Sequence, residues 1–363
     1  MNILHIFPGK VWGGAEQYVL DLGKHLEAQG HRVSYLSYAV APIVERLPAG
    51  LNHSTLPFFS SIDLYSAWKM AKQIDSRNID LLHIHDKRFL LLAIWAKKWA
   101  KHPCKVVLTR HIARKSAVCP LFRWAYRQLH RMVFVSQLSK TLWHEANEWF
   151  PSSLCSVILN SIPPVERKED AVPLLRDRFR IPIDTPLLIF TGRVRKSKGC
   201  ATLIEALAQV SDLPFHLVFI GQCKPMDYEK KLKKIAETYG IADRISFYGF
   251  SREVRSLIQQ ADIGVAPSIV KEACPLSPME FMQTGKPIVT TNNGGQTEYV
   301  SQEESGFLVP PKSVEALSQA LRKLLEQPAL REKLGTSGLH YFQSHLTYEH
   351  FISKVLAVYT AER

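Results

Sequence analysis

The N-terminal residues alternate apolar runs with turn-forming segments, and this order constrains the fold more than any other feature of the chain. Residues 2–7 form an apolar run typical of a β-strand, and a loop rich in proline and glycine follows at 8–14. A helical spacing of apolar residues then ends at Gly30, after which residues 31–37 begin a second strand. A strand, helix, strand order predicts parallel pairing and a doubly wound α/β sheet.

Strand-like segments continue along the chain in two series. Prolines and charged residues interrupt the pattern between 163 and 184, which is typical of an interdomain linker. We therefore expect two Rossmann-like doubly wound domains facing each other across a cleft, with ligands at the carboxyl ends of their strands. The remaining predicted strands lie at 81–85, 105–109, 132–136, 155–159, 187–191, 215–221, 245–249, 263–267 and 287–291. The predicted boundaries are 1–165 for the N-terminal domain, 166–184 for the linker, 185–345 for the C-terminal domain, and 346–363 for a helix that returns to the N-terminal domain.

Hydropathy and cysteine spacing exclude several classes of protein. No apolar run reaches the roughly 18–20 residues that a membrane-spanning helix requires, and the longest run, 89–96, is followed directly by two lysines. The first apolar run has no basic leader before it and no small-residue cleavage pattern, so we expect a cytoplasmic protein. The six cysteines are scattered without a CxxC pair, which favours reduced thiols over a disulfide or zinc framework.

Positive charge is concentrated in one stretch of the chain. From Lys87 to Arg131 there are twelve Lys or Arg residues and no Asp or Glu, in a chain of net charge +13. Cations mixed with aromatic residues suit an anionic membrane surface, a phosphorylated acceptor or nucleic acid, although no nucleic-acid motif accompanies the charge. The alternative is a solvated basic face whose aromatic side chains point into the core. The aromatic residues are Phe89, Trp95, Trp99, Phe122, Trp124 and Tyr126.

The segment GRVRKSKG at 192–199 lies between a predicted strand and a predicted helix. A diphosphate needs fixed cations and free backbone amides, and it favours a helix N-terminus. Arg193 and Lys198 would reach two phosphates from this one loop, and Gly199 would let the backbone approach closely. Taken alone, the segment is equally a basic surface turn.

A second element is a pair of glutamates, Glu272 and Glu280, in the sequence EACPLSPME. They follow a predicted strand, and the next helix is expected to begin near Pro278. Glu280 would then lie in its first turn, where a negative charge suits the helix dipole. The amides near Leu276 and Ser277 would face a phosphate. A glutamate in a first helical turn is also common as a simple cap.

The order of these elements is more specific than any one of them. The 192–199 segment is followed by GQ at Gly221, by the two glutamates and by TNNGGQTE at 291–298. In this order and spacing the chain resembles the family 4 retaining glycosyltransferases of the GT-B fold. The N-terminal half agrees, because GGAE at 13–16 is similar to the loop that follows the first strand in that family. Further matching positions are His83-Ile84-His85-Asp86, Thr109-Arg110-His111, Ser136 and Asn160-Ser161-Ile162-Pro163.

The resemblance implies how a nucleotide-sugar donor is held. Arg193 and Lys198 would bind the diphosphate. Glu280 would bind the ribose hydroxyls, and Glu272 the hydroxyls of the transferred sugar. The other implied donor contacts are the loops at Gly192 and Gly221, the amides of Leu276 and Ser277, the base contacts near Phe250 and Ser251, and the close approach of Gly13 and Gly14.

The resemblance also implies an acceptor side and a cellular role. His111 would lie near the transferred sugar, and Glu16, His85 and Arg110 would contact the acceptor. The donor is expected to be a UDP-, GDP- or ADP-linked sugar. The acceptor is expected to be a glycan, a lipopolysaccharide core or a lipid-linked oligosaccharide. The protein would then lie on the inner face of the cell membrane, held through 87–131.

Stabilising the departing nucleoside diphosphate is the main catalytic task in such a reaction. The catalytic residues would be His111, Arg193, Lys198 and Glu272. Two cations and helix-end amides suffice, and the sequence contains no DxD pattern, so we expect no metal and no cofactor. His83 and His85 alternate at a strand end beside an aspartate, where a metal site is conceivable, but we interpret them as hydrogen-bonded pocket residues.

Two carboxylates about 5 Å apart act as acid and nucleophile in retaining glycosidases. The resemblance assigns Glu272 and Glu280 to binding instead, with retention by front-face attack and the acceptor proton passing to the departing phosphate oxygen. The chain departs from the family between these glutamates, where many relatives read GFGxxxx and this chain reads ACPLSPM. Pro275 removes one backbone N–H there. The usual NG before an acidic residue also appears as Asn160-Ser161.

Three alternatives remain open from the sequence. The acceptor could be a soluble sugar phosphate or a small metabolite. A non-catalytic membrane-surface protein on the same fold would be expected to lose Arg193, Lys198 or Glu280, and all three are present. An NAD-dependent dehydrogenase would carry G-x-G-x-x-G after its first strand, and this chain does not.

Overall fold

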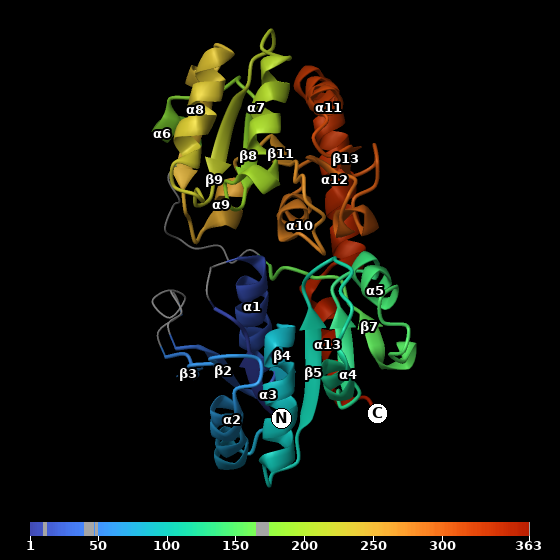
Figure 1. Cartoon of the computed structure of the whole chain (residues 1–363). Helices are drawn as coiled ribbons and strands as arrows, with labels where there is room; N and C mark the ends of the chain where they lie inside the picture. Colours follow the sequence, from blue (N-terminus) through green and yellow to red (C-terminus); the bar gives the residue numbers. More distant parts are fainter. Residues whose placement is uncertain (10–12, 40–46, 48–49, 165–173, 363) are drawn as a thin grey trace. The chain divides into compact units, whose positions relative to one another are not determined.

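The computed structural model describes residues 1–9, 13–39, 47, 50–164 and 174–362. The chain divides into two compact units, each with its own parallel sheet (Figure 1). Unit 1 is Met1–Asn160 together with Tyr348–Arg363, and unit 2 is Ser161–Thr347. The prediction of two Rossmann-like α/β domains is confirmed.

Unit 1 is built on a seven-stranded parallel sheet. Its strands are β1 (Asn2–Ile6), β2 (Arg32–Tyr38), β3 (His53–Leu56), β4 (Leu81–Ile84), β5 (Lys105–Arg110), β6 (Arg131–Phe134) and β7 (Cys155–Val157). They lie in the order β3-β2-β1-β4-β5-β6-β7. The direction of winding reverses between β1 and β4, and ligands bind at such switch points, outside the carboxyl ends of the strands.

Helices cover both faces of this sheet, which is why its strands are apolar on both sides. The helices are α1 (Gly14–Ala28), α2 (Leu64–Arg77), α3 (Leu90–Trp99), α4 (Pro120–Tyr126), α5 (Gln137–His144) and α13 (Tyr348–Thr360), with 3₁₀ turns η2 (Lys87–Phe89) and η3 (Ser152–Leu154). Leu4 and Ile6 of β1 pack into the core that includes α2 and α3. The alternate residues Ile3 and Phe7 pack into the core that includes α1 and α13.

The last helix, α13, is part of unit 1 although unit 2 precedes it in the chain. Phe351, Ile352 and Val355 are buried in the same core as the residues of α1. The Tyr359 hydroxyl lies 2.6 Å from Nδ1 of His83 in β4. Burial of three apolar side chains and this buried hydrogen bond hold α13 against the sheet of unit 1.

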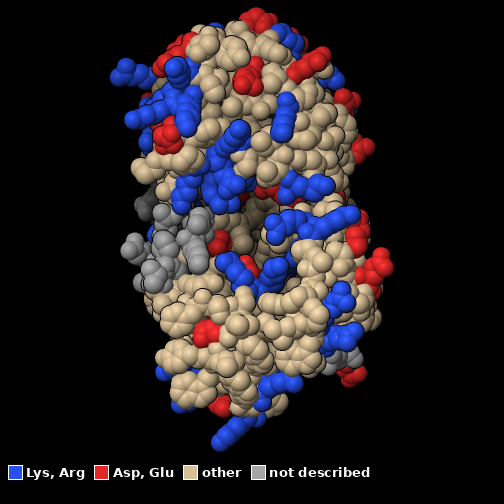
Figure 2. All heavy atoms as spheres, in the orientation of Figure 1, with Lys and Arg blue, Asp and Glu red and all other residues tan. Residues whose placement is uncertain are grey.

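The aromatic residues between 87 and 131 mostly face the core of unit 1. Phe89 and Tyr126 are fully buried, and Trp95, Phe122 and Trp124 pack against the same core, while Trp99 is 46% exposed. The basic residues of this stretch are mostly exposed. Of the two readings left open by the sequence, a basic face with aromatic residues turned inward therefore describes this stretch better. Basic side chains also occupy more of the face drawn in Figure 2 than acidic ones do.

Unit 2 is built on a six-stranded parallel sheet. Its strands are β8 (Leu187–Thr191), β9 (His216–Ile220), β10 (Ile245–Gly249), β11 (Ile263–Ala266), β12 (Ile288–Thr291) and β13 (Gly306–Val309). Their order is β10-β9-β8-β11-β12-β13, so the switch point lies between β8 and β11. The helices are α6 (Leu175–Phe179), α7 (Cys200–Ala208), α8 (Tyr228–Thr238), α9 (Val254–Ile258), α10 (Leu276–Gln283), α11 (Val314–Glu326) and α12 (Pro328–His345), with 3₁₀ turns η4 (Lys196–Lys198), η5 (Ala242–Arg244) and η6 (Gly295–Glu298).

Two features of the fold, one of them in the linker and one in the sheets of both units, differ from the sequence prediction. The predicted linker at 166–184 includes α6, whose Leu175 is buried and whose Arg176 pairs with Asp262 at 3.1 Å. This part of the linker is therefore part of unit 2, and residues 165–173 lie outside the described residues. The short strands β3 and β13 were also not predicted from the sequence. Among the described residues, no helix combines the length and the apolar character that crossing a bilayer requires.

Candidate functional site

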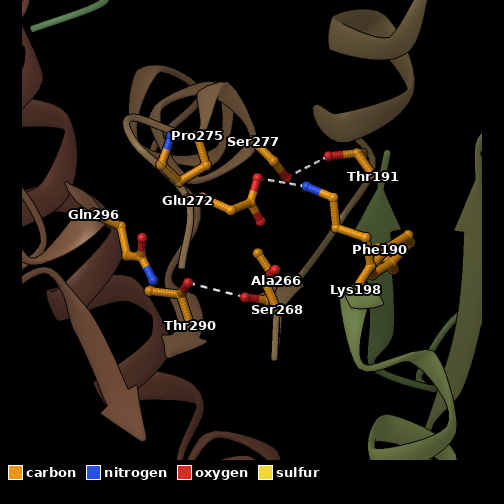
Figure 3. A pocket seen from close by; sticks show the side chains of 10 residues that line it. All are labelled: Phe190, Thr191, Lys198, Ala266, Ser268, Glu272, Pro275, Ser277, Thr290 and Gln296. Atoms are coloured by element: carbon orange, nitrogen blue, oxygen red, sulfur yellow. Dashed lines mark hydrogen bonds and ion pairs between the residues drawn. The ribbon is translucent and has the colours of Figure 1, made fainter. Parts of the chain in front are cut away.

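A pocket of about 300 Å³, part of it open to solvent, lies at the switch point of the unit 2 sheet. Its walls come from the carboxyl ends of the adjacent strands β8, β11 and β12 and from the loops that follow them. The lining residues are Phe190, Thr191, Lys198, Ala266, Ser268, Glu272, Pro275, Ser277, Thr290 and Gln296 (Figure 3). The sequence prediction of a ligand site after these strands agrees with this position.

Lys198 and Glu272 reach toward each other across the pocket (Figure 3). The Lys198 ammonium donates to Oε2 of Glu272 at 2.6 Å, and the two side chains are 23% and 20% exposed. A ligand can therefore still reach both groups. The structure brings these two predicted residues together and gives the pocket one cation and one anion.

Gly199 lets the loop after β8 pack against the loop after β11. Its φ is +73°, and a Cβ atom there would lie 2.0 Å from the carbonyl oxygen of Pro267. The amide of Ile269 donates to the Ser197 carbonyl at 3.0 Å and joins the same two loops. Only glycine fits this contact, and Lys198, the residue before it, is positioned as a result.

Gly192 and Gly221 serve a similar contact between the loops after β8 and β9. A Cβ atom at Gly221 would lie 1.8 Å from the Gly192 carbonyl oxygen. Both residues have positive φ, +123° at Gly192 and +148° at Gly221. Close packing of the two loops therefore requires glycine at Gly221, while at Gly192 it is the positive φ that favours glycine. The contact of both residues with a donor stays a prediction.

The loop after β12 supplies a buried amide that lacks one partner. Gln296 is 1% exposed, and its Nε2 donates to the carbonyl of Thr291. Its Oε1 has no hydrogen-bond partner among the described residues. A buried acceptor of this kind is costly unless something donates to it, so a ligand hydroxyl or amide is a suitable partner.

This loop also positions the catalytic candidate Glu272. The amide of Gly295 donates to the Glu272 carbonyl at 2.8 Å. A Cβ atom at Gly294 would lie 2.8 Å from the same carbonyl oxygen. The two glycines of TNNGGQTE therefore have a role that the motif alone did not reveal, which is to hold the backbone of Glu272.

Helix α10 begins at the pocket, since its N-cap residue Pro275 and its second residue Ser277 are among the lining residues. The Ser277 hydroxyl lies 2.5 Å from the Thr191 hydroxyl, and the Tyr299 hydroxyl donates to the Pro275 carbonyl at 2.6 Å. Burial raises the pKa of Tyr299 well above its usual range, so this phenol stays protonated. The first amides of a helix have no partner within the helix, and they favour an anion.

The predicted start of α10 was wrong. The helix begins at Leu276 rather than near Pro278, because proline is tolerated anywhere in the first turn, where the amides have no acceptor in the helix. Glu280 therefore lies in the second turn, and no acidic residue lies in the first. The proposed dipole interaction of Glu280 loses its basis, while its contact with a ribose stays a prediction.

Several predicted donor residues do not line the pocket. Arg193 is half-buried in the loop after β8, and Phe250 is 42% exposed after β10. The Ser251 hydroxyl accepts the amide of Glu253 at 3.0 Å and closes a turn. The predicted donor residues absent from the lining are Gly13 and Gly14 of unit 1 and Gly192, Arg193, Gly221, Phe250, Ser251, Leu276 and Glu280 of unit 2.

Sequence reasoning missed several polar residues of the pocket. Thr191, Ser268, Thr290 and Gln296 line it, and Tyr299 supports it. Gln296 belongs to the quoted motif TNNGGQTE and was available as a signal. The hydroxyl residues stand at strand ends and have no pattern that separates them from other buried threonines and serines.

Unit 1 places a second set of predicted residues at the carboxyl edge of its sheet. Gly13 and Gly14 begin α1, and Glu16 lies in its first turn. A Cβ atom at Gly13 would be 3.4 Å from Oε2 of Glu16, so this carboxylate reaches back over the start of the helix. His85 follows β4 and His111 follows β5, and both therefore lie at the same edge.

Four histidines of unit 1 cluster on the sheet: His5, His85 and His111 are hydrogen-bonded in a row, and the ring of His83 packs against those of His5 and His85. Nδ1 of His5 lies 3.0 Å from Nε2 of His85, and Nδ1 of His85 lies 3.2 Å from Nε2 of His111. His83 contacts Tyr359 at 2.6 Å and the Thr109 hydroxyl at 2.7 Å. Burial lowers the pKa of His5 to about 3 and that of His111 to about 4, so both rings are neutral near pH 7.

The tautomers of these hydrogen-bonded histidines follow from one unpaired atom. Nε2 of His5 is buried with no partner among the described residues. An unpaired acceptor is less costly than an unpaired N–H, so we assign the hydrogen of His5 to Nδ1. Each ring then donates from Nδ1 to Nε2 of the next, and His111 carries its hydrogen on Nδ1. His111 therefore offers a neutral N–H donor.

Within the described ranges, one ring nitrogen each of His5, His83 and His85 could hold a metal ion, and these three atoms lie within 4.8 Å of one another. Three histidines can hold a transition metal. Here both ring nitrogens of His83 and of His85 already have partners among the surrounding side chains. The hydrogen bonds account for the cluster, and the expectation of no metal stays a prediction.

Arg110 organises its own loop. The side chain is 5% exposed, and one guanidinium nitrogen donates to the Arg114 carbonyl at 2.8 Å and to the Ser116 hydroxyl at 3.1 Å. Burial lowers the pKa of this guanidinium from its usual value. These contacts shape the 110–116 loop, and the acceptor-binding role of Arg110 stays a prediction.

Two Rossmann-like units, with a lysine–glutamate pocket at the switch point of the second, are the architecture of GT-B glycosyltransferases. Two family profiles match this chain. "Glycosyltransferase Family 4" matches residues 12–166, and "Glycosyl transferases group 1" matches residues 173–340. The chain belongs to the family 4 glycosyltransferases of the GT-B fold, and the resemblance in the sequence is confirmed.

Relatives with curated names are similar over most of the chain. A putative glycosyltransferase EpsD of Bacillus subtilis is 26% identical over 289 residues, 74% of each chain. N-acetyl-alpha-D-glucosaminyl L-malate synthase of Bacillus anthracis is 24% identical over 96% of this chain and 93% of its own. Phosphatidyl-myo-inositol mannosyltransferase of Mycobacterium leprae is 25% identical over 90% and 87%.

Solved structures share the fold over nearly the whole length. A glycosyltransferase from Rickettsia africae superposes with a TM-score of 0.86 at 21% identity, covering 99% of this chain and 97% of that one. Anabaena Alr3699/HepE in complex with UDP-glucose gives a TM-score of 0.81 at 21% identity, covering 98% and 99%. At this level of identity the likeness supports the fold alone.

Proposed function

We propose that this glycosyltransferase moves a hexose-type sugar from a nucleotide-sugar donor to a hydroxyl of a glycan or lipid-linked acceptor, with retention. The observation that carries the proposal is the Lys198–Glu272 pair in the pocket of unit 2. A donor diphosphate would take the ammonium of Lys198 as its partner. Glu272 would then be released to accept hydrogen bonds from the hydroxyls of the sugar.

The chemistry of this proposal needs no protein nucleophile. The bond between the anomeric carbon and the phosphate oxygen breaks, and the acceptor oxygen forms a bond to that carbon on the same face. The acceptor proton goes to the departing phosphate oxygen. Lys198 and the free amides of α10 would stabilise the negative charge that develops on the diphosphate, so we propose that no divalent metal takes part.

We propose two further roles at the site. The buried, unpartnered Oε1 of Gln296 would accept a hydrogen bond from the donor. The N–H that we assign to Nδ1 of His111 would donate to a sugar hydroxyl. His111 would act as a neutral donor rather than as a base, because burial keeps its pKa at about 4.

The donor and acceptor classes rest on what the similar proteins are named for. Alr3699/HepE has been crystallised with UDP-glucose, which supports a UDP-linked hexose as the first donor to test. A phosphatidyl-myo-inositol mannosyltransferase supports a lipid acceptor. A second candidate acceptor is a soluble metabolite. The L-malate synthase supports it, because the name of that protein gives a small soluble acid and the alignment covers nearly the whole length of both proteins.

Lys198→Ala tests the diphosphate role, with UDP-glucose as the donor. We expect turnover to fall about 10²-fold or more, or about 3 kcal/mol, as for other groups that stabilise a developing charge. Lys196→Ala is the matched control, because Lys196 lies in the same 3₁₀ turn, is exposed and does not line the pocket. Turnover of Lys198→Ala equal to that of the control would contradict the proposal.

A double variant separates two reasons for that loss. Removing the lysine leaves the Glu272 carboxylate unpaired, and its charge alone would repel a diphosphate. Lys198→Ala with Glu272→Gln removes both charges. If this double variant recovers the turnover of the wild type, Lys198 only neutralises Glu272 and does not bind the diphosphate. The anomeric configuration of the product, read by NMR, tests retention independently.

A further inference from the structure

Exposed apolar side chains gather on unit 1 at the start of α2 and in the loop before it. Phe59 is 79% exposed, and Trp68 is 44% exposed. Ile62, Leu64 and Tyr65, which lie between them in the sequence, are exposed as well. Single exposed apolar residues are ordinary, but a concentrated group marks a surface that binds something apolar.

Helix α2 has two distinct faces. The outer face carries Tyr65, Trp68, Lys69 and Lys72, which follow one another at helical spacing along one stripe. The Lys72 ammonium lies 3.8 Å from the centre of a Trp68 ring, and Lys69 lies 5.6 Å from the Tyr65 ring. The opposite face is buried in the core through Ala67, Met70, Ala71 and Ile74.

The loop before α2 holds Phe59 outward by its backbone. Phe58 has a φ of +45°, which is unfavourable for an aromatic residue, and its ring packs 4.8 Å from that of Phe89 in the core. Asp63 accepts the amide of Phe59 at 3.0 Å and also caps α2. The strained residue therefore buries one phenylalanine and presents the next to solvent in a fixed position.

We propose that the surface formed by residues 59–72 docks on an anionic lipid bilayer. Aromatic rings favour the level of the headgroups, and lysines that extend from the same stripe pair with anionic lipids. Asp63 is the only acidic residue between 57 and 74, and its carboxylate is already bonded within the loop. A second protein chain fits less well, since lysine is depleted at the centres of protein interfaces.

The surface lies at the edge of the sheet that carries the predicted acceptor residues. The loop follows β3, so it is at the carboxyl edge, where His85 and His111 also lie. Helix α2 packs beside α3 near the β2–β3 end of this sheet (Figure 1). Docking of this surface on a bilayer would bring the carboxyl edge of the unit 1 sheet close to a lipid-linked acceptor. This role of the surface rests on the proposed function. The predicted surface at 87–131 has fewer exposed apolar groups.

Vesicle sedimentation tests the proposal with the full chain. Vesicles of equal parts phosphatidylglycerol and phosphatidylcholine are compared with vesicles of phosphatidylcholine alone, at low and at high salt. Phe59→Ser with Trp68→Ser should lower partition onto the anionic vesicles at least tenfold. Lys69→Glu with Lys72→Glu should lower it by a similar factor and remove most of its salt dependence.

Ile183→Ser with Met226→Ser is the matched control, because both residues are apolar and highly exposed on unit 2. Binding of UDP by calorimetry is measured for every variant and should be unchanged. Wild-type partition by the Phe59 and Trp68 variant, or no partition by the wild type, would overturn the proposal. The proposal would also be overturned if the Phe59 and Trp68 variant bound vesicles like the wild type but no longer formed a dimer that the wild type forms in solution. That result would assign the surface to contact with a second copy of the chain. If the wild type binds the anionic vesicles but transfers no sugar, only the proposed function is overturned.

Discussion

Unit 1 should lose stability as the pH falls from about 7 to about 5, and replacing His5 by asparagine should make this loss smaller. Asparagine has no titrating group, and its amide can donate from nearly the position of the histidine Nδ1. The hydrogen bond to Nε2 of His85 is therefore retained. The variant isolates the titration of one buried ring from the rest of the cluster.

The magnitude follows from the pKa of His5. Burial lowers this pKa from 6.5 to about 3 in the folded chain. Between these values the unfolded chain binds a proton that the folded chain does not, so stability falls as the pH falls. From pH 7 to pH 5 this one ring should cost about 2 kcal/mol of the free energy of unfolding. The wild type should lose about 2 kcal/mol more over this interval than His5→Asn does.

Tryptophan fluorescence during urea unfolding measures this quantity in unit 1 alone. All seven tryptophans lie between residues 12 and 149, so the signal does not report unit 2. His350→Asn is the control, because that side chain is exposed on α13. Equal pH-dependent losses in the wild type and in His5→Asn would refute the reasoning, and a changed urea dependence would show that the variant alters more than one ring.

Three further predictions concern the donor pocket and the reaction. Gly199→Ala should weaken UDP binding at least tenfold in calorimetry, because its Cβ would meet the Pro267 carbonyl at 2.0 Å; Gly240→Ala, with a similar φ of +67° but open space around it, should not. Chelation with EDTA should leave turnover unchanged, and a loss restored by added metal would contradict the metal-independent reaction. The burial that lowers the pKa of His111 to about 4 predicts no loss of turnover from this ring until the pH falls below about 5. A histidine-dependent decline centred near pH 6.5 would contradict the neutral-donor role.

The strands and the donor loop were predictable because their signals are local. Apolar runs between turn-forming residues located most of the strands in both sheets, since each parallel strand is buried on both faces. GRVRKSKG and the glutamate of EACP are short motifs that follow strands. Because strands run parallel, their carboxyl ends meet at one edge, where ligands were expected. The family resemblance assigned Lys198 and Glu272 to one donor site.

Other elements had no local signal. Strand β3 has three half-buried or exposed polar residues before the buried Leu56, rather than an apolar run. The start of α10 was misplaced because Pro278 is compatible with several positions in a first turn. Glu280 was therefore assigned to the wrong turn.

The sequence by itself determined the two-unit α/β class, the family and the presence of a basic loop and two glutamates after strands. Only the tertiary structure decided which groups meet. Strand register places His5 beside His83, and the return of α13 brings Tyr359 to the same cluster. The loop after β12 places Gln296 in the pocket and Gly295 on the backbone of Glu272. These contacts join residues far apart in the chain, and their energies depend on burial and distance, which residue order alone does not specify.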